Sequence, residues 1–222
     1  MNKKQAAGER AAQFVQDGMT IGLGTGSTAY YATMKIGELV AQGLSVVAIP
    51  TSRHTEQLAQ QLNIPVTTFA DVSELDLTID GADAVTPELD LIKGGGGALL
   101  REKLVAAASN TLIIVADDSK LVQNFAGLSI PIEIVTFAWE STFRKIECIG
   151  GKPTLRKVGD RPFVTDNANY IVDTVFDHVE PRVLHQNLKS IVGVVETGLF
   201  PGMASRVIVA REKGVEVIDA AP

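Results

Sequence analysis

Short apolar runs and amphipathic segments alternate along the first half of the chain. Continuous apolar runs predict buried strands, while apolar residues that recur every three or four positions predict helices. The runs place strands at 19–23, 44–49, 65–68, 76–79 and 111–116, and the helical periodicity places helices at 3–16 and 52–62, with another that ends near residue 40. Strands and helices in such alternation form a parallel sheet with helices on its faces.

The pattern changes after about residue 124. Strands are predicted at 130–135, 154–155, 170–172 and 191–196, and helices at 137–148 and 181–188. This mixture is typical of a small α+β domain, and two further runs, 206–210 and 215–219, return the chain to the first sheet. We expect an α/β protein with a Rossmann-like open, mostly parallel sheet flanked by helices and a smaller inserted α+β domain. The large domain would comprise residues 1–125 and 199–222, and the small domain residues 126–198.

Composition narrows the range of partners. The chain has 222 residues, of which 45% are hydrophobic and 21% charged, with a formal net charge of -6. This negative charge argues against general binding to nucleic acid or to an anionic membrane, and no apolar run is long enough to predict a membrane span. The single cysteine, Cys148, cannot form an intramolecular disulfide. We therefore expect a cytoplasmic protein in which Cys148 is a buried structural thiol.

Four consecutive glycines follow Lys93 and lead directly into a predicted helix. Glycine lets the backbone approach a ligand closely, and the N–H groups at the start of a helix favour anions. The residues three and four positions from Glu102 on this helix are all apolar, namely Ala98, Leu99, Val105 and Ala106. Glu102 should therefore be a partly desolvated carboxylate that can abstract a proton. The alternative is an ordinary solvated face at 101–103.

The segment GLGTGST at 22–28 joins a predicted strand to a predicted helix. It has Ser27 where a dinucleotide fingerprint has its third glycine, and it lacks the Gly-Lys-Ser/Thr ending of a P-loop. What remains is a nest of N–H groups with the hydroxyls of Thr25, Ser27 and Thr28. Such a nest suits a hydroxylated or phosphorylated small molecule, although a tight turn with a helix cap has the same residue types.

Carboxylates and a lysine follow two other predicted strands. Asp80 and Asp83 are spaced so that both can line one pocket wall and, near a lysine, divide acid and base duties; a solvated Asp-Gly turn is the alternative. Lys120 could balance a phosphate as a point charge or be an exposed loop lysine. The three histidines are scattered without ligand spacing, so the sequence predicts no metal site.

Taken together, these motifs resemble one family over nearly the whole chain, ribose-5-phosphate isomerase type A. The matching segments occur in the order of that family: GLGTGSTA at 22–29, TIDGADAV at 78–85, KGGGGALLREK at 93–103, ADDSK at 116–120, PIEIV at 131–135, GKPTLR at 151–156, TDNANYIVD at 165–173 and TGLF at 197–200. One departure is Ala168, where the family usually has glycine.

The resemblance implies reversible conversion of D-ribose 5-phosphate to D-ribulose 5-phosphate, in the non-oxidative branch of the pentose phosphate pathway, without cofactor or metal. Glu102 would move the proton between carbons 2 and 1 through an enediol(ate), and Lys93 would stabilise the negative oxygen. Asp80 and Asp83 would bind hydroxyls and assist ring opening. The other implied substrate contacts are Thr25, Gly26, Ser27, Thr28, Gly81, Ala82, Gly94, Gly95, Gly96 and Lys120, with Lys4 as a further candidate.

Two other functions compete with this interpretation. A non-catalytic sugar-phosphate sensor on a related fold would keep the phosphate loop and lose the base, whereas Glu102 and Lys93 are both present. A nicotinamide-dependent dehydrogenase is disfavoured by the incomplete fingerprint. The resemblance also implies a homodimer or a homotetramer, and the sequence does not choose between them.

Overall fold

The structure, a computed structural model, describes residues 2–220. The chain forms two compact units. The first unit comprises Met1–Ala82, Arg101–Leu121 and Met203–Pro222, and the second comprises Asp83–Leu100 and Val122–Gly202. The chain therefore passes several times from one unit to the other.

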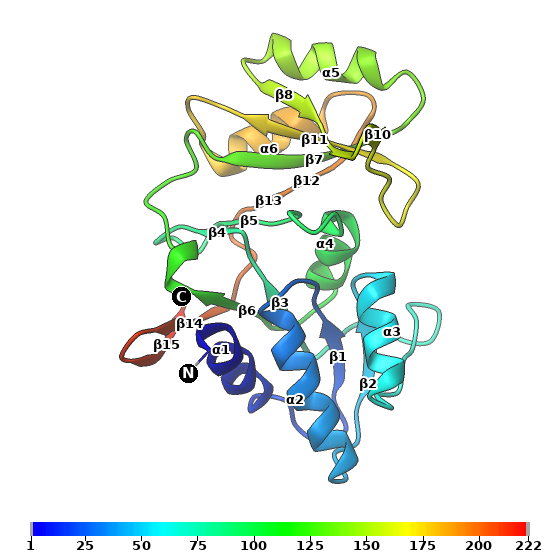
Figure 1. The fold of residues 1–222 in the computed structure, drawn as a ribbon, viewed down its shortest axis with the longest axis vertical. Coiled ribbons are helices and arrows are strands. Elements are labelled where there is room, and N and C mark those ends of the chain that lie inside the picture. The colour runs from blue at the N-terminus through cyan, green and yellow to red at the C-terminus, as the bar shows by residue number, and fades with distance from the viewer. Residues whose placement is uncertain (1, 221–222) are drawn as a thin grey trace. The chain divides into compact units, whose positions relative to one another are not determined.

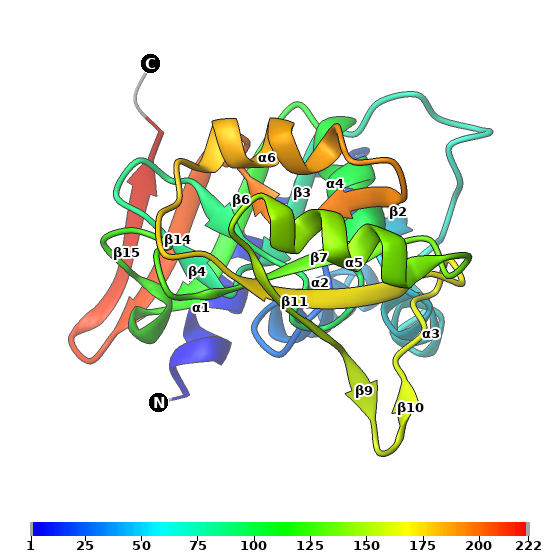
Figure 2. The same ribbon diagram turned by 90° about the horizontal axis from the view of Figure 1, so that it is seen from above.

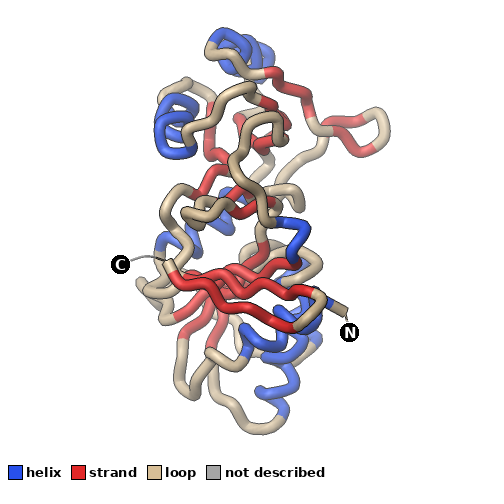
Figure 3. Tube along the Cα trace, turned by 90° about the vertical axis from the view of Figure 1, so that its left-hand side faces the viewer, coloured by secondary structure: helices blue, strands red, loops and turns tan. Residues whose placement is uncertain are grey.

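The first unit is built on a six-stranded sheet in the order β15-β14-β6-β3-β1-β2 (Figure 1). Its strands are β1 Thr20–Leu23, β2 Val47–Pro50, β3 Leu77–Gly81, β6 Leu112–Asp117, β14 Arg206–Arg211 and β15 Gly214–Asp219. All neighbouring strands are parallel except β14 and β15, which form an antiparallel hairpin (Figure 3). The predicted open, mostly parallel sheet is confirmed, as is the return of the last two strands to it.

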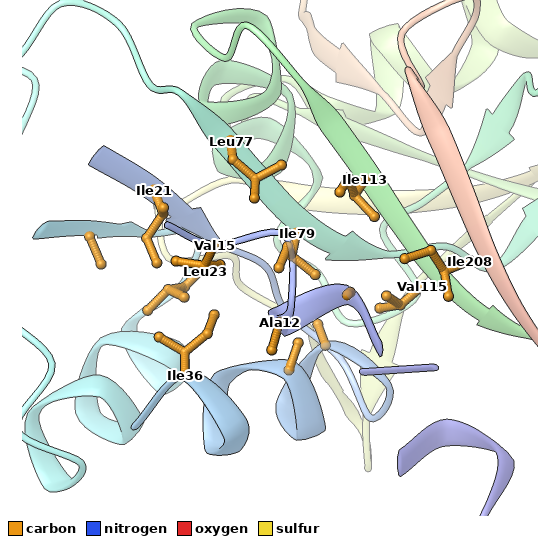
Figure 4. Close-up of a cluster of buried hydrophobic side chains, with 14 of the residues drawn as sticks. Ala12, Val15, Ile21, Leu23, Ile36, Leu77, Ile79, Ile113, Val115 and Ile208 are labelled. Carbon is orange, nitrogen blue, oxygen red and sulfur yellow. The ribbon is translucent and has the colours of Figure 1, made fainter. Parts of the chain in front are cut away.

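Helices cover both faces of this sheet. They are α1 Lys3–Ala12, α2 Ala29–Ala41, α3 Arg53–Gln61 and α4 Leu99–Ala107, with a short 3-10 helix at Asp118–Lys120. Figure 4 shows one face, where Ile36 of α2 and Ala12 of α1 pack with Ile21, Leu23 and other aliphatic strand residues. On the other face Val105 of α4 packs with Ile49 and Leu75. Alternate strand residues thus face different helices, as a doubly covered sheet requires.

The second unit contains a four-stranded antiparallel sheet in the order β12-β7-β11-β8. The strands are β7 Ser129–Ile134, β8 Lys152–Leu155, β11 Tyr170–Val175 and β12 Val194–Thr197, and the helices are α5 Trp139–Cys148 and α6 Pro181–Lys189. Both helices lie over one face of the sheet (Figure 2), where Ile146 of α5 and Leu188 of α6 are buried with Ile132 and Val172. The expected α+β character is confirmed.

Several two-residue strands in the second unit were not predicted individually. β4 Ala84–Val85, β5 Leu91–Ile92 and β13 Leu199–Phe200 form a small sheet, and β9 Lys157–Val158 pairs with β10 Arg161–Pro162. The sheet draws residues 83–100 and 199–202 into the second unit. The compact units therefore do not coincide with the expected boundaries, and the division into 1–125 with 199–222 and 126–198 stays a prediction.

Three local predictions were wrong. The first helix ends at Ala12 rather than residue 16, because the chain turns and buries Val15 in the core. The expected strand at 65–68 is reduced to a single bridge between Ala48 and Val66. Cys148 is exposed rather than buried, because the buried face of α5 is carried by Thr142 and Ile146 and Cys148 lies off that face.

Candidate active site

The loop at 24–28 connects β1 to α2 in the first unit. Gly24 is needed because a Cβ there would lie 2.2 Å from Asp80 Oδ1. Gly26 has a φ of +117°, a conformation that side-chain-bearing residues rarely adopt. Thr28 precedes α2 but its side chain makes no capping hydrogen bond. Gly24 therefore allows close packing against Asp80, and Gly26 allows a change of chain direction before α2.

Hydroxyl groups hold this loop in place. Thr25 Oγ1 donates to Ser52 Oγ at 2.8 Å, Ser52 Oγ donates to Thr55 Oγ1 at 3.0 Å, and Thr55 Oγ1 donates to the Gly24 carbonyl at 3.1 Å. Thr25 Oγ1 also lies 2.7 Å from Thr51 Oγ1. The hydroxyl chain starts and ends on the loop, so it closes a ring of hydrogen bonds around it. Nothing near Thr51 or Ser52 in the chain reveals their contact with Thr25.

Lys4 brings positive charge to this loop, since its Nζ donates to Ser27 Oγ at 2.9 Å. Burial works to raise the pKa of the Asp117 carboxyl, but hydrogen bonds from the hydroxyl and N–H of Ser119, with the charges of Lys120 and Lys4, hold that pKa below its usual value. Lys120 and Lys4 therefore both act electrostatically on the Asp117 carboxylate. Lys4, which the sequence marked as a further candidate, belongs to this cluster.

A cavity of about 660 Å³ opens beside the same loop. Its lining includes Lys4, Gly26, Ser27, Tyr31 and His54. A lysine, a serine and exposed loop backbone are groups that bind an anion, and the cavity is large enough for a phosphorylated sugar. The 24–28 loop therefore borders an open recess, and its role as an anion-binding nest stays a prediction.

Asp80 lies near the end of β3 and is completely buried. Its Oδ1 accepts hydrogen bonds from the N–H groups of Thr25 at 3.0 Å and Gly81 at 2.7 Å. N–H donors stabilise a carboxylate that has lost its water. Asp80 is thus a fixed buried carboxylate against the 24–28 loop, and the solvated Asp-Gly turn considered from the sequence is wrong at this position.

Glu102 lies in the first turn of α4 and is only 4% exposed. Val105 and Ala106, which follow it on the same face, are buried too, while Leu104 on the other side of the helix is exposed. The interpretation of 101–103 as an ordinary solvated face is therefore wrong, and the predicted desolvated carboxylate is observed.

The second unit carries the remaining predicted site residues, Lys93 and the glycine loop. Lys93 is 2% exposed, its N–H donates to the Gly198 carbonyl at 2.8 Å, and its ammonium lies 5.6 Å from the centre of the Phe200 ring. The Gly95 N–H donates to Asp83 Oδ2 at 2.7 Å. A buried lysine followed by a constrained loop is a local arrangement that can stabilise developing negative charge.

The predicted residues thus fall into two groups. The first unit holds Thr25, Gly26, Ser27, Thr28, Asp80, Gly81, Ala82, Glu102 and Lys120, and the second holds Asp83, Lys93, Gly94, Gly95 and Gly96. Within residues 2–220 no group of three or more His, Cys, Asp or Glu side chains is placed to hold a metal ion. In the same range no helix has the length and apolarity to cross a membrane.

The first unit is an α/β fold that combines a recess suited to an anion with a buried carboxylate at the start of a helix. These are features of proteins that transfer protons on a phosphorylated small molecule. The family model described as ribose 5-phosphate isomerase A (phosphoriboisomerase A) matches residues 47–214. Ribose-5-phosphate isomerase A of Bacillus cereus is 56% identical over 218 residues, which cover 97% of this chain and 99% of the relative. The chain belongs to the ribose 5-phosphate isomerase A family.

Solved structures agree with this assignment. Ribose 5-phosphate isomerase A of Methanocaldococcus jannaschii is 35% identical with a TM-score of 0.92, and the match covers 98% of both chains. A D-ribose-5-phosphate isomerase in complex with phospho-erythronic acid is 36% identical with a TM-score of 0.93, covering 99% of this chain and all of that one. The predicted family, fold class and enzyme class, an aldose-ketose isomerase, are confirmed.

Proposed function

We propose that this enzyme interconverts D-ribose 5-phosphate and D-ribulose 5-phosphate by metal-free proton transfer, with Glu102 as the base. Family membership supplies the reaction, and the burial of the Glu102 carboxylate is the single observation that supports the mechanism. A carboxylate removed from bulk water is a stronger base than one in solution. It also sits on a rigid helix, which fixes its direction.

The proton balance of the reaction fits one base. In the open-chain aldose, the C1 carbonyl acidifies the proton on carbon 2. Glu102 removes that proton, the electron pair forms a C1–C2 double bond, and the C1 oxygen takes up negative charge and then a proton. The protonated Glu102 returns its proton to carbon 1 while the hydroxyl on carbon 2 loses its proton and becomes the ketone. No electron acceptor or cofactor is needed, because oxidation at carbon 2 balances reduction at carbon 1.

Lys93 is proposed to stabilise the enediolate oxygen. Its ammonium is buried, and a charge in a dry site acts more strongly on a developing anion than one in water. Among the glycine-loop N–H groups, those of Gly95 and Gly97 donate to Asp83 Oδ2 and to the Gly94 carbonyl. Lys93 is therefore assigned the main electrostatic role, with the Gly96 N–H as the loop donor.

The 24–28 loop is proposed to bind the substrate phosphate. Gly26, Ser27 and Thr28 would donate hydrogen bonds to its oxygens, and Lys120 and Lys4 would balance its charge. Thr25 would act mainly by holding the loop, because its hydroxyl lies in the Ser52 and Thr55 network. Asp80 and Asp83 would bind sugar hydroxyls and assist ring opening. The related isomerase in complex with phospho-erythronic acid supports a site for a phosphorylated carbon chain that ends in an anionic group.

The test is isomerase activity on D-ribose 5-phosphate after exhaustive EDTA treatment, with ketose formation followed directly. We expect activity to survive chelation, because the proposed mechanism uses only side-chain and backbone groups of the protein. Activity that returns only with a divalent metal would make Asp80 and Asp83 candidate ligands and would refute the metal-free mechanism. Binding of the sugar phosphate without turnover in either condition would point to the non-catalytic sensor.

We also propose that the enzyme acts in the cytoplasm as a homodimer or homotetramer and binds no nucleic acid. The net charge of -6 and the single cysteine support the compartment and the absence of a nucleic-acid partner. Exposed apolar side chains such as Phe137 and Val192 are compatible with burial against a second copy. Light scattering coupled to size-exclusion chromatography measures the mass directly, and a monomer would refute the assembly.

A further inference from the structure

A guanidinium group holds the glycine loop from within the second unit. Arg156 Nη1 donates to the Gly94 carbonyl at 2.9 Å and to the Gly95 carbonyl at 3.1 Å. The Gly94 carbonyl also accepts from the Gly97 N–H at 2.9 Å. Two successive carbonyls of the loop are therefore directed at one side chain, which lies about sixty residues further along the chain.

Arg156 is itself fixed from several sides. Its Nε donates to Asp173 Oδ2 at 2.8 Å and its Nη2 to Asp173 Oδ1 at 2.5 Å, a two-pronged pair that sets the plane of the guanidinium. The Arg156 N–H donates to the Ile171 carbonyl and its own carbonyl accepts from the Phe163 N–H, both at 2.9 Å. The pair is mostly buried, so solvent weakens it little.

Phe163 completes the support of the loop. The guanidinium carbon of Arg156 lies 5.8 Å from the centre of the Phe163 ring. Gly97 has a φ of +82°, and a Cβ there would lie only 2.4 Å from the Phe163 ring. The ring therefore packs directly on the end of the loop while Arg156 holds its start, so the two side chains act on the same short segment.

The direction of a carbonyl fixes the direction of the next N–H, because the trans peptide is planar and the two groups point opposite ways. The carbonyls of Gly94 and Gly95 belong to the peptides that carry the N–H groups of Gly95 and Gly96. With the Gly95 N–H held by Asp83, the Gly96 N–H is directed away from Arg156. We infer that Arg156, oriented by Asp173, is a positioning residue that aims the glycine-loop N–H groups at the developing enediolate oxygen.

This inference rests on the proposed isomerisation, and its test is steady-state kinetics of R156A and D173N on D-ribose 5-phosphate. A misdirected donor weakens transition-state stabilisation more than substrate binding, so kcat should fall about 10- to 100-fold with KM changed less than about threefold. The kcat of R156K should also fall, because an ammonium cannot form a bidentate pair with Asp173 and at the same time donate to the Gly94 and Gly95 carbonyls. Added guanidinium should restore part of the kcat of R156A and none of E102Q.

The matched control is K152A. Lys152 forms an ion pair with Asp177 in the same unit, but both side chains are exposed and neither contacts the glycine loop, so kcat and KM should stay at wild-type values. Unchanged kcat in folded R156A and D173N, or a fall in thermal stability alone, would overturn the inference. If R156A does not fold, the kcat and KM values of D173N and R156K test the inference instead. An inactive wild type refutes the proposed function instead, whereas an active wild type with fully active variants refutes only the role of Arg156.

Discussion

The two glycine-containing loops, 24–28 in the first unit and 93–97 in the second, are held in shape by different chemistry. Neutral hydroxyls of Ser52 and Thr55 surround the first loop. One N–H of each loop is held by a carboxylate, that of Thr25 by Asp80 and that of Gly95 by Asp83. The second loop is held in addition by the guanidinium of Arg156, which fixes the directions of two of its carbonyls. This difference fits the roles proposed for the loops, phosphate binding by the first and positioning of N–H groups for the chemical step by the second.

Glu102→Gln is expected to have the largest effect. The amide cannot take the proton, so kcat should fall by roughly 10² to 10⁴ while KM stays close to that of the wild type. The variant keeps the shape of the side chain, which limits effects on folding. Glu74→Gln, at an exposed position, is the control and should be fully active. Near-normal turnover of Glu102→Gln would show that the base is another residue.

Lys120→Ala should have a smaller effect, and the effect should be on ligand binding rather than on turnover. If Lys120 balances the substrate phosphate as proposed, its removal should raise the inhibition constant of phospho-erythronic acid about tenfold and leave kcat nearly unchanged. The difference from wild type should shrink as salt is added, because the charge is only partly shielded from solvent. Lys213→Ala, in the exposed turn between β14 and β15, is the control. An unchanged inhibition constant would show that Lys120 does not contribute to phosphate binding. It would also weaken the assignment of different roles to the two loops.

The smallest expected effect is on stability alone. Ala168 has a φ of +61°, a left-handed conformation that costs alanine energy and glycine almost none. Ala168→Gly should raise the free energy of unfolding by about 0.5 to 1 kcal/mol, since part of the gain is offset by the greater freedom of glycine in the unfolded chain. Ala168→Ser keeps the Cβ and should gain nothing. Urea denaturation measures the free energy of unfolding of both variants. A lower value for Ala168→Gly than for the wild type would show that the backbone of Ala168 is not strained.

The departure at Ala168 shows what a sequence comparison can reveal about a local conformation. The family usually has glycine there, and the structure has a backbone angle that favours glycine. The turn is nevertheless formed, because the neighbouring polar side chains hold it. Thr165, Asn167 and Asn169 all donate hydrogen bonds to Oε1 of the buried Glu133. Tertiary contacts therefore outweigh a local preference of about one kcal/mol.

The sequence by itself determined the features that depend on near neighbours. Alternation of apolar runs with helical periodicity predicted the α/β sheet, because burial of one face requires that pattern. The apolar residues three and four positions from Glu102 predicted its burial, because such residues share one face of a helix. The small-molecule role of 24–28 stays a prediction. The burial of Glu102 follows from residues within four positions of it in the chain.

Only the tertiary structure decided the contacts between distant segments. Arg156 meets Asp173 because β8, which ends just before Arg156, pairs with β11. Its contact with the Gly94 carbonyl comes from the packing of the second unit, and nothing near Arg156 in the chain encodes either partner. The hydroxyl ring of Thr25, Ser52 and Thr55 and the exposure of Cys148 depend likewise on how elements pack. Local pattern fixes which face of an element is apolar, whereas the partners of its polar side chains follow only from the register and packing of the whole unit.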